Sequence, residues 1–511
     1  MSLFANSSGK VTEKQLSSGL LKKINNGTAM NSSLGDLSKL DTDSKSNMVG
    51  AINEVADRIG NLHGRIANVS DQMSDLVQYP VKPSETGVKV VTYPYGDIRR
   101  YGAVDSTTTD STPFVQNAIN SSFALGTDLL IPEGTYRING TLKLPSHLSI
   151  RGSNASNYAF SNFENIKSKI INYAKNLFEP LNITDTSKGI GSLTLKMSGV
   201  YIHNSYSPAR DQTLFNKIEH LGSNIENNIF HNHGTIIQGA LKNVSFFNNN
   251  RCTNIGQSLL NSKVGTRTDG ISQDTEGIVD SYLEKNYLSG DSANNITLLQ
   301  SSYAGNAFIR SNFIEYCKYV FDFATTGDVM YDSNSIDYVF NVWKTDIVSS
   351  TIINNIFSHI SPSYLSKFPN ADNEMRTGEW WVINRKKVNR TTISNNRCSN
   401  NVSNFIYIKG LSVFNLTING NSYDTSVVNK IKFETAVSNA TTDNKNIYID
   451  EFMNKRFDTL PNPKLNSTAL ETSPTVTFDG MQVIHNGKIL FNDNGKWKDL
   501  SGLEIRLSIL G

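Results

Sequence analysis

The sequence contains little that would mark a membrane protein, a disulfide-stabilised secreted protein or a metalloprotein. Its 511 residues include three cysteines, Cys252, Cys317 and Cys398, an odd number without the spacing of metal ligands. No apolar run reaches the roughly 18 residues that a membrane-spanning helix needs, and the polar start of the chain does not resemble a signal peptide. We therefore expect a protein made in a reducing cytoplasm, without a membrane partner and without a metal site.

Neither sign of charge dominates the chain. Lysine and arginine together number 48, aspartate and glutamate 46, and the net charge is +2. Proteins that bind nucleic acid or a membrane surface through their net charge have a clear excess of basic residues. Neither partner is therefore expected. The sequence also lacks a Walker loop, a dinucleotide fingerprint, G-x-S-x-G and His-Glu-x-x-His.

An asparagine with apolar neighbours at fixed positions recurs along the chain. In FIRSNFIEYC, residues 308–317, Asn312 interrupts a run of strand-forming residues, with Ile309 three positions before it and Ile314 two positions after it. Asparagine is depleted in strands and favoured in tight bends. The same pattern of an asparagine between two apolar residues has eight anchors: Asn228, Asn250, Asn286, Asn312, Asn334, Asn355, Asn396 and Asn421.

The spacing of the anchors indicates a repeat architecture. Successive anchors are 22, 36, 26, 22, 21, 41 and 25 residues apart. The intervals of 36 and 41 contain one period plus an insertion, or two periods in the second case. Stacked β coils about 4.8 Å apart would let each buried Asn amide bond the amides of the neighbouring coils. The alternative is that asparagine is simply frequent in this chain.

This repeat resembles the asparagine ladder of right-handed parallel β-helices with the pectate-lyase-like fold. Residues 97–152 also resemble the opening of the pectate-lyase-like module of phage tailspikes, since they contain Asp-x-x-x-Tyr-Gly-Ala, Pro-x-Gly-x-Tyr and Leu-x-Leu-Pro. The usual Gly-Asp-Gly turn is replaced by Val104, Asp105 and Ser106. The resemblance implies an all-β fold, with a trimeric right-handed parallel β-helix over residues 80–455.

A short helix is expected near residues 112–122, between these motifs. Asp110 or Ser111 would cap it, and Pro113 lies in its first turn. Its apolar face would cover the open end of the β-helix, which otherwise exposes apolar surface and unpaired strand edges. The residues of this face are Phe114, Ala118 and Ile119.

A strict 3.5-residue repeat precedes the β-helix region. Its apolar positions alternate spacings of four and three: Met48, Ile52, Val55, Ile59, Leu62, Ile66, Val69, Met73 and Leu76. This pattern predicts an α-helical coiled coil over 47–79, rather than one amphipathic helix on a globular core. The tailspike resemblance implies a homotrimer. Residues 1–46 resemble the adaptor segment of tail fibres from phages of Gram-positive hosts, which implies attachment to phage tail or baseplate proteins.

Residues 456–511 form a third part of the chain. Two Asn-Gly pairs, Asn486-Gly487 and Asn494-Gly495, are flanked by alternating apolar residues. This pattern predicts a short antiparallel meander in a small C-terminal β domain. The domain would bind the host surface or hold the chains of an oligomer together.

The repeat also predicts which side chains point outward. If the residue two positions after each anchor points inward, the residues one and three positions after it point outward. Glu315 and Asp337 then lie side by side on consecutive coils, on the same face as Tyr287 and Phe313. Glycoside hydrolysis requires such a pair of carboxyl groups, so these two residues are the predicted catalytic pair, and Tyr287, Phe313 and His359 are predicted to bind substrate. The alternative is a solvated polar face.

A second charged stack is expected two positions before the anchors. It contains Glu284 and Asp332 as further catalytic candidates, and Arg310 as a substrate-binding residue or as the charge that neutralises its neighbours. In the later insertion, Trp380 and Trp381 would stack on a sugar or pack at a subunit contact. Reserve carboxylates lie in the two insertions: Asp269, Asp274, Glu276 and Glu379.

These features lead to the hypothesis of a phage tailspike, assembled in the host cytoplasm, carried on the virion and acting at the bacterial surface. It would bind a capsular polysaccharide or exopolysaccharide and depolymerise it by glycosidic hydrolysis. Three alternatives stay open: a phosphodiesterase that degrades wall teichoic acid, an adsorption fibre without catalysis, and a polysaccharide lyase. Hydrolysis needs no cofactor, whereas a lyase or a phosphodiesterase would use a divalent cation such as calcium.

Overall fold

The computed structural model describes residues 50, 52–62, 64–65, 78–153, 167–184, 190–262, 277–412, 415–433, 447–450, 482–485, 488–493 and 496–499. The chain divides into two compact units. One contains residues 1–80 and 91–93, and the other contains residues 81–90 and 94–511. Each unit is described by itself below.

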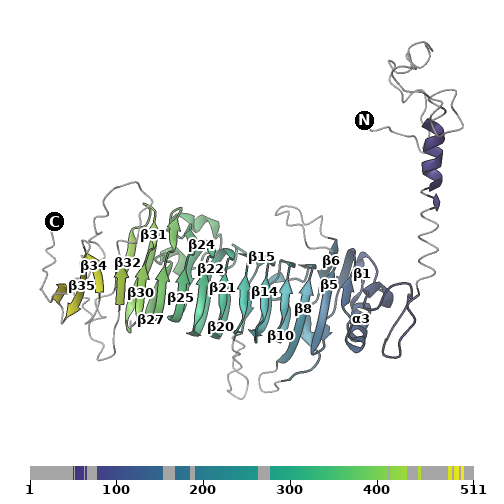
Figure 1. Ribbon diagram of the computed structural model, residues 1–511, viewed down its shortest axis with the longest axis horizontal. Coiled ribbons are helices and arrows are strands. Elements are labelled where there is room, and N and C mark those ends of the chain that lie inside the picture. Colours follow the sequence, from purple (N-terminus) through teal and green to yellow (C-terminus); the bar gives the residue numbers. More distant parts are fainter. Residues whose placement is uncertain are drawn as a thin grey trace, which may run out of the picture. The chain divides into compact units, whose positions relative to one another are not determined.

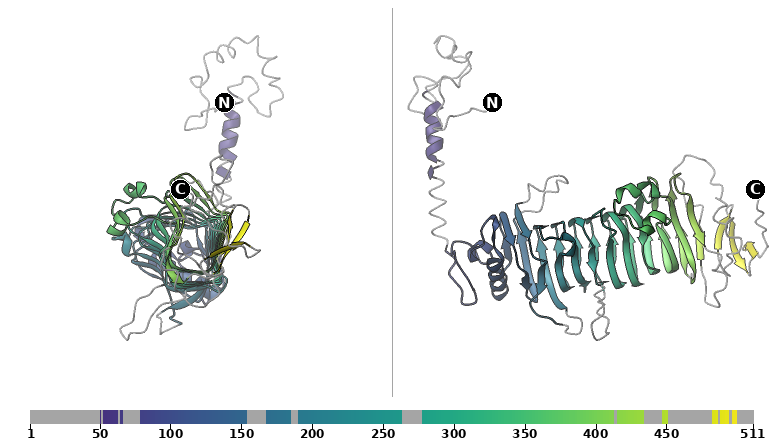
Figure 2. Two further views of the ribbon diagram at one scale, coloured as in Figure 1. Left: turned by 90° about the vertical axis from the view of Figure 1, so that its left-hand side faces the viewer. Right: turned by 180° about the vertical axis from the view of Figure 1, so that it is seen from behind.

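The larger unit is a parallel β-helix, as the asparagine repeat predicts. Its strands line three faces, and on each face the strands of successive coils pair in parallel in chain order (Figure 1). Seen along the axis of the unit, the strands of successive coils superimpose around a common interior (Figure 2). Apolar side chains fill this interior in one continuous core.

The first face holds the strands that precede the asparagine anchors. These strands are β2 (Leu129–Ile131), β5 (His147–Gly152), β8 (Gly191–Ser198), β11 (Asn224–Glu226), β14 (Phe246–Asn248), β18 (Tyr282–Glu284), β21 (Phe308–Arg310), β23 (Val329–Asp332), β25 (Ile347–Ile353), β27 (Ile383–Ser394), β30 (Leu416–Asn419) and β33 (Ile447–Asp450).

The second face holds the strands that follow the anchors. These strands are β1 (Ser106–Asp110), β3 (Gly134–Ile138), β6 (Ser168–Asn172), β9 (Tyr201–Asn204), β12 (Ile229–His231), β15 (Arg251–Ile255), β19 (Tyr287–Gly290), β22 (Phe313–Gly327), β24 (Ser335–Trp343), β26 (Ile356–Ser358), β28 (Arg397–Ser399) and β31 (Ser422–Tyr423).

The third face closes the coils, and the second halves of the long strands β22 and β24 continue onto it. Its other strands are β4 (Leu142–Leu144), β7 (Asn176–Pro180), β10 (Thr213–Leu221), β13 (Thr235–Lys242), β16 (Ser258–Asn261), β17 (Ile278–Val279), β20 (Thr297–Gly305), β29 (Asn404–Ser412) and β32 (Asn429–Phe433).

The predicted asparagine ladder is confirmed along the bend between the first and second faces. All eight anchors are buried, and the Nδ2 atom of each donates to the Oδ1 atom of the next, from Asn228 to Asn421. At Asn312 the distance from Nδ2 to Oδ1 of Asn334 is 2.9 Å, and Nδ2 also donates to the carbonyl of Leu283 at 2.8 Å. The amide thus satisfies the polar groups that the bend buries.

The residue before each anchor makes the bend. Ser311 has a φ of 57° and Ser333 a φ of 54°, and the corresponding residues of the other coils also lie in the left-handed region. With one residue in this conformation, the chain turns and the next side chain points into the interior. The apolar positions three before and two after the anchors are then buried on every coil, which includes Cys252 and Cys398.

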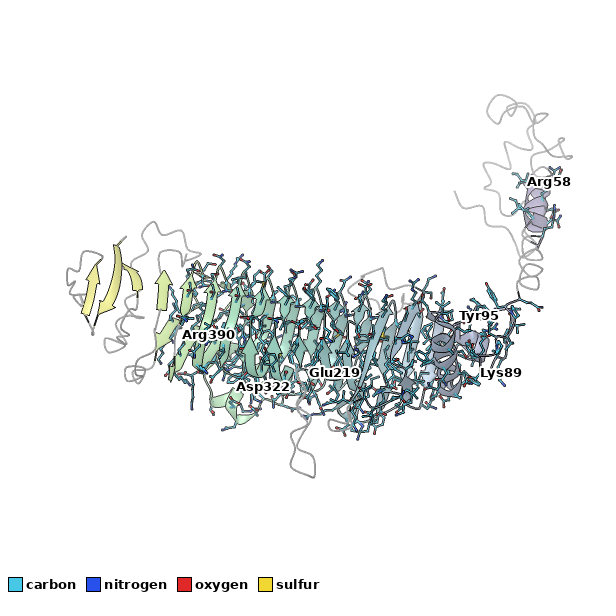
Figure 3. The ribbon with its side chains drawn as sticks, turned by 60° about the horizontal axis from the view of Figure 1, so that its bottom comes forward. Arg58, Lys89, Tyr95, Glu219, Asp322 and Arg390 are labelled. Carbon is cyan, nitrogen blue, oxygen red and sulfur yellow. The ribbon has the colours of Figure 1, made fainter. Side chains whose placement is uncertain are left out.

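The 41-residue interval between Asn355 and Asn396 is one coil plus an insertion. Ile352 pairs directly with Ile393, and Nδ2 of Asn355 donates to Oδ1 of Asn396 at 3.0 Å. The insertion contains the short helices η6 (Pro362–Lys367) and α4 (Asn373–Thr377). It is anchored to the third face by charge, since Lys318 of β22 contacts Asp372 and Glu374 at 2.6 and 2.5 Å. Asp322, labelled in Figure 3, lies on the same strand and pairs with Lys344 at 2.9 Å.

The helix expected near 112–122 is α3 (Thr112–Leu125), which covers the N-terminal end of the β-helix (Figure 1). Ser111 is its N-cap residue but makes no side-chain capping bond, and Asp110 before it accepts at Oδ1 from the backbone N–H of Thr112 at 2.9 Å. Val115, Ala118 and Ile119 are buried against the first coils, whereas Phe114 is only partly buried. The described residues of this unit also contain two short 3₁₀ helices, η3 (Ile98–Tyr101) and η5 (Ala209–Asp211).

The smaller unit contains helix over residues 52–62. Its three central seam residues, Val55, Ile59 and Leu62, are 44%, 51% and 54% exposed. The single chain thus leaves the apolar seam of the heptad repeat uncovered. Ile52, a further seam position, is half-buried. The other heptad positions and the segment 1–46 lie outside the described residues, so the coiled coil and the attachment segment stay predictions. No helix in the described parts of the chain is long and apolar enough to cross a membrane.

The predicted C-terminal meander consists of β34 (Gln482–His485), β35 (Lys488–Asp493) and β36 (Lys496–Asp499), paired antiparallel in sequence order. Each pair is separated by the two residues of a predicted Asn-Gly turn. Strand β34 also pairs in parallel with β33, so the meander continues the first face.

The ladder leads to a prediction about stability. Asn312→Ala should lower the free energy of unfolding by about 1–3 kcal/mol, because buried bonding partners on both neighbouring coils lose their contacts. Ser311→Ala is the matched control, since Ser311 is the adjacent residue of the same bend and its side chain is exposed. Denaturant unfolding of the two variants tests this, and equal destabilisation would contradict a stabilising role of the ladder.

Candidate active site

The register of the second face brings Glu315 and Asp337 together. Phe313, Ile314 and Glu315 of β22 pair with Ser335, Ile336 and Asp337 of β24. Ile314 and Ile336 point into the core, so the two carboxylates point outward from adjacent strands, whose spacing is about 4.8 Å. The outward column that the sequence predicts runs through His231, Thr253, Ser289, Glu315, Asp337, Ser358 and Ser399.

Glu315 lies in a largely desolvated position on this face. Its side chain is mostly buried, and its Oε1 atom accepts a short hydrogen bond from the hydroxyl of Tyr287 on the preceding coil. Burial raises the pKa of the Glu315 carboxyl, and the charge of Asp337 raises it as well, against the hydrogen bonds from Tyr287 and Ser289. A carboxyl group in such a setting tends to retain its proton as its neighbour ionises.

Asp337 is held by a different set of partners. Its Oδ1 atom lies 2.5 Å from Nδ1 of His359 and accepts from the backbone N–H of Tyr338 at 2.9 Å. These contacts fix the carboxylate beside Glu315. The two acidic groups therefore share a face and differ in environment, which is the arrangement that separates the roles of an acid and a base.

An aromatic stack runs beside the two carboxylates. The rings of Tyr316, Tyr338 and His359 lie on consecutive coils, with centroids 5.0 and 4.6 Å apart and almost parallel planes. Tyr364 of the insertion packs edge-on against Tyr338 and His359. His359 was predicted as a site residue, whereas the three tyrosines were not. For Tyr316 and Tyr338 the signal in the sequence is the position directly after the outward column, one residue beyond Glu315 and Asp337, whereas Tyr364 lies in the insertion and has no such signal.

Tyr287 and Phe313 form a second aromatic stack, on the other side of the carboxylates. The guanidinium of Arg251 lies 5.0 Å from the centroid of Tyr287, whose ring stacks on Phe313 at 5.4 Å. The next residue in this column is Ser335. Because serine is small, the column has no bulky side chain on that side of the Phe313 ring.

The second charged stack is present on the first face. Glu284 pairs in register with Arg310, and Arg310 with Asp332. The carboxylate of Glu284 is 2.5 Å from Nε of Arg310, and Asp332 accepts hydrogen bonds from Ser333 and Asn354. These charges lie on the other side of the bend from Glu315 and Asp337, and the structure provides them with partners of their own.

The expectation that Trp380 and Trp381 form a sugar platform needs correction. Their side chains are 1% and 0% exposed, so neither presents a ring face to a ligand. The Nε1 atom of Trp380 donates to the carbonyl of Met375, and that of Trp381 donates to Glu379 at 3.0 Å. The pair packs the insertion onto the β-helix core, and Glu379 beside it is exposed. Asp269, Asp274 and Glu276 lie outside the described residues.

Among the residues that the structure describes, no group of three or more His, Cys, Asp or Glu side chains is placed to hold a metal ion.

Comparisons with known proteins give remote structural similarities. No protein-family profile and no curated protein sequence matches the chain. One similar structure is the surface adhesin PfbA of Streptococcus pneumoniae, at 16% identity over 69% of this chain and 99% of that one, with a TM-score of 0.41.

Two further structures are the catalytic unit of an α-1,3-glucanase from Streptomyces thermodiastaticus and the tailspike of Escherichia coli bacteriophage HK620 in complex with a pentasaccharide. The glucanase has 14% identity over 83% of this chain and 73% of that one, and the tailspike 13% over 75% and 69%, each with a TM-score of 0.44. Similarities at this level assign neither a substrate nor a reaction to this chain.

The environment of Glu315 leads to a prediction about its protonation. Asp337→Asn should lower the pKa of Glu315, because it removes a neighbouring negative charge, whereas Tyr287→Phe should raise it by removing a hydrogen bond to the carboxylate. Infrared difference spectra over pH measure the protonated carboxyl band, and its loss in Glu315→Gln assigns it. Shifts of the same sign in both variants would contradict the assigned causes.

Proposed function

We propose that this protein is a phage tail appendage that binds a polysaccharide of the bacterial surface and cleaves it by glycosidic hydrolysis. The observation that carries the proposal is the pair Glu315 and Asp337, adjacent on consecutive coils, unlike in environment and bordered by aromatic stacks. The resemblance of residues 97–152 to the opening of tailspike β-helix modules supports the assignment to a phage tail.

The environments suggest a role for each carboxyl group. Glu315 is buried and has a raised pKa, so it suits the general acid that protonates the leaving oxygen. Asp337, positioned by His359 and by the N–H of Tyr338, suits the nucleophile. Because the two residues stand on adjacent strands, a separation of about 5–5.5 Å between the carboxyl groups is accessible, which is typical of retaining hydrolases.

The aromatic side chains would supply the sugar contacts. The stack of Tyr316, Tyr338 and His359 follows the direction of the β-helix axis beside the carboxylates, so it offers ring edges and hydroxyl groups to successive sugar units. On the other side, the space beside Ser335 would admit a sugar ring against Phe313. Aromatic rings with a polar end suit ligands that combine apolar ring faces with hydroxyl groups.

The uncovered seam of the N-terminal helix supports a homotrimer. Val55, Ile59 and Leu62 are exposed in the single chain, and a 3.5-residue apolar repeat buries such positions between helices of a coiled coil. We assign the partner helices to further copies of this chain, and the segment before the helix to attachment on the phage tail.

The catalytic assignment predicts the effect of removing each acid. Glu315→Gln and Asp337→Asn should lower the rate of polymer cleavage by about 10²–10⁴-fold, because each removes a proton-transfer or nucleophilic group. The substrate is purified host surface polysaccharide, and reducing ends are counted. Asp424→Asn is the matched control, since Asp424 occupies the same register position as Asp337, three coils further along the β-helix.

Wild-type rates in both carboxamide variants would exclude this pair as the catalytic centre. If the wild-type protein releases phosphate esters from teichoic acid, the reaction is phosphodiester cleavage. If it shortens no host polymer, the protein is an adsorption fibre.

The assembly is tested by light scattering of the intact chain. A homotrimer has three times the chain mass of 56.5 kDa. Ile59→Asp should weaken the assembly of the N-terminal segment, because it places charges in the apolar seam, whereas Asn61→Asp lies outside the seam and serves as the control. A monomeric or dimeric mass for the unaltered protein would contradict the trimer.

A further inference from the structure

The second face changes its chemical character along the axis. On the N-terminal side of Glu315, the described strands β6, β9, β12, β15 and β19 contain no aspartate or glutamate. Their outward positions hold Ile171, Ile229, Thr253 and Ser289, and between these a set of basic and aromatic side chains: Lys169, Tyr201, His203, His231, Arg251 and Tyr287. We call this set the basic strip. Among the described strands of this face from β6 to β24, the first carboxylates are Glu315 and Asp337 themselves.

Arg251 is the basic residue nearest to the two carboxylates along this strip. It pairs in register with Tyr287, which in turn pairs with Phe313 of the strand that bears Glu315. Its guanidinium lies over the ring of Tyr287, whose hydroxyl donates to Glu315. Arg251 is thus two coils, about 9.6 Å, from the proposed acid.

The two histidines beside Arg251 are uncharged donors or acceptors rather than cations. The rings of His203 and His231 stack with centroids 5.3 Å apart, and Nδ1 of His231 lies 2.8 Å from the hydroxyl of Thr253. Burial lowers the pKa of His203, and burial with the nearby His203 and Arg251 lowers the pKa of His231 to about 4. The positive charge of the basic strip therefore comes from Lys169 and Arg251.

We propose that the basic strip binds an anionic group of the polymer, a carboxylate or a phosphodiester, at Arg251 and His231. This inference rests on the proposed function, since it assigns a subsite on the same face. A guanidinium suits both groups, because each offers oxygen atoms in the geometry of its paired N–H donors. The neutral ring of His231 adds a hydrogen-bonding group beside it.

The subsite also sets the direction in which the polymer lies. The carboxylate of Asp337 disfavours an anion at the cleavage point, whereas Arg251 favours one two coils from Glu315. An anionic repeat would therefore lie along the second face with its charged group toward β15 and its neutral linkage at the carboxylates. A neutral polymer would gain only hydrogen bonds to its hydroxyl groups from Arg251, without an ion pair.

Binding of defined polymers tests the subsite separately from catalysis. The protein carries Glu315→Gln, so that no probe is cleaved, and titration calorimetry measures binding of polygalacturonate, poly(glycerol phosphate) and neutral dextran. We expect one of the two anionic polymers to bind more tightly than dextran, which also decides between carboxylate and phosphodiester. Adding Arg251→Gln should weaken that binding about tenfold or more, because a charge-assisted hydrogen bond is lost.

The matched control is Arg397→Gln, at the same register position on β28, beyond the carboxylates. It should leave the affinity unchanged, and Arg251→Lys should restore part of it. Equal affinity in the Arg251→Gln variant, binding of dextran as tight as that of the anionic polymers, or no binding of either anionic polymer would overturn the subsite. If the wild-type protein cleaves no polymer but binding still depends on Arg251, the proposed hydrolysis alone is overturned and the subsite stands.

Discussion

The hydrogen bond from one buried asparagine amide to the next is the interaction on which the rest of the structure depends. Each amide bonds the neighbouring coils and satisfies the backbone of a bend that would otherwise bury unpaired groups. The ladder also fixes register, because a coil displaced by one residue would lose its amide partner and turn its apolar side chains outward.

Fixed register gives the outer face its chemistry. Since neighbouring strands are aligned residue by residue, side chains at the same register position form columns, such as Arg251, Tyr287 and Phe313. The same alignment forces two carboxylates, Glu315 and Asp337, into proximity. Such a pair is costly for stability, because like charges on adjacent strands repel. This repulsion is among the causes that raise the pKa of the Glu315 carboxyl, after burial.

The insertion between Asn355 and Asn396 shows how the repeat accommodates further structure. The ladder continues without interruption across it, so the coil itself is unchanged. Charged contacts from Lys318 and the buried pair Trp380 and Trp381 attach the insertion to the core. As a result, Tyr364 is placed against Tyr338 and His359 at the edge of the candidate site.

Much of the fold and half of the site could be predicted from the sequence. The apolar residues at fixed offsets from each asparagine determine the coils, the ladder and the register, because side chains alternate between the two sides of a strand. Those offsets alone align Glu315 with Asp337 and Glu284 with Arg310 and Asp332.

The tertiary structure decided what the offsets do not specify. Tyr316, Tyr338 and His359 have φ values of 55°, 48° and 52°, so strand alternation ends at them, and their stacking follows from the turned backbone. Trp380 and Trp381 lie in an insertion outside the repeat, where no periodicity indicates a direction, and packing against the core buried them. The sequence alone determined the side-chain direction of residues inside the repeat. Contacts between the coils and with the insertion determined the direction of side chains at the turns and in the insertion.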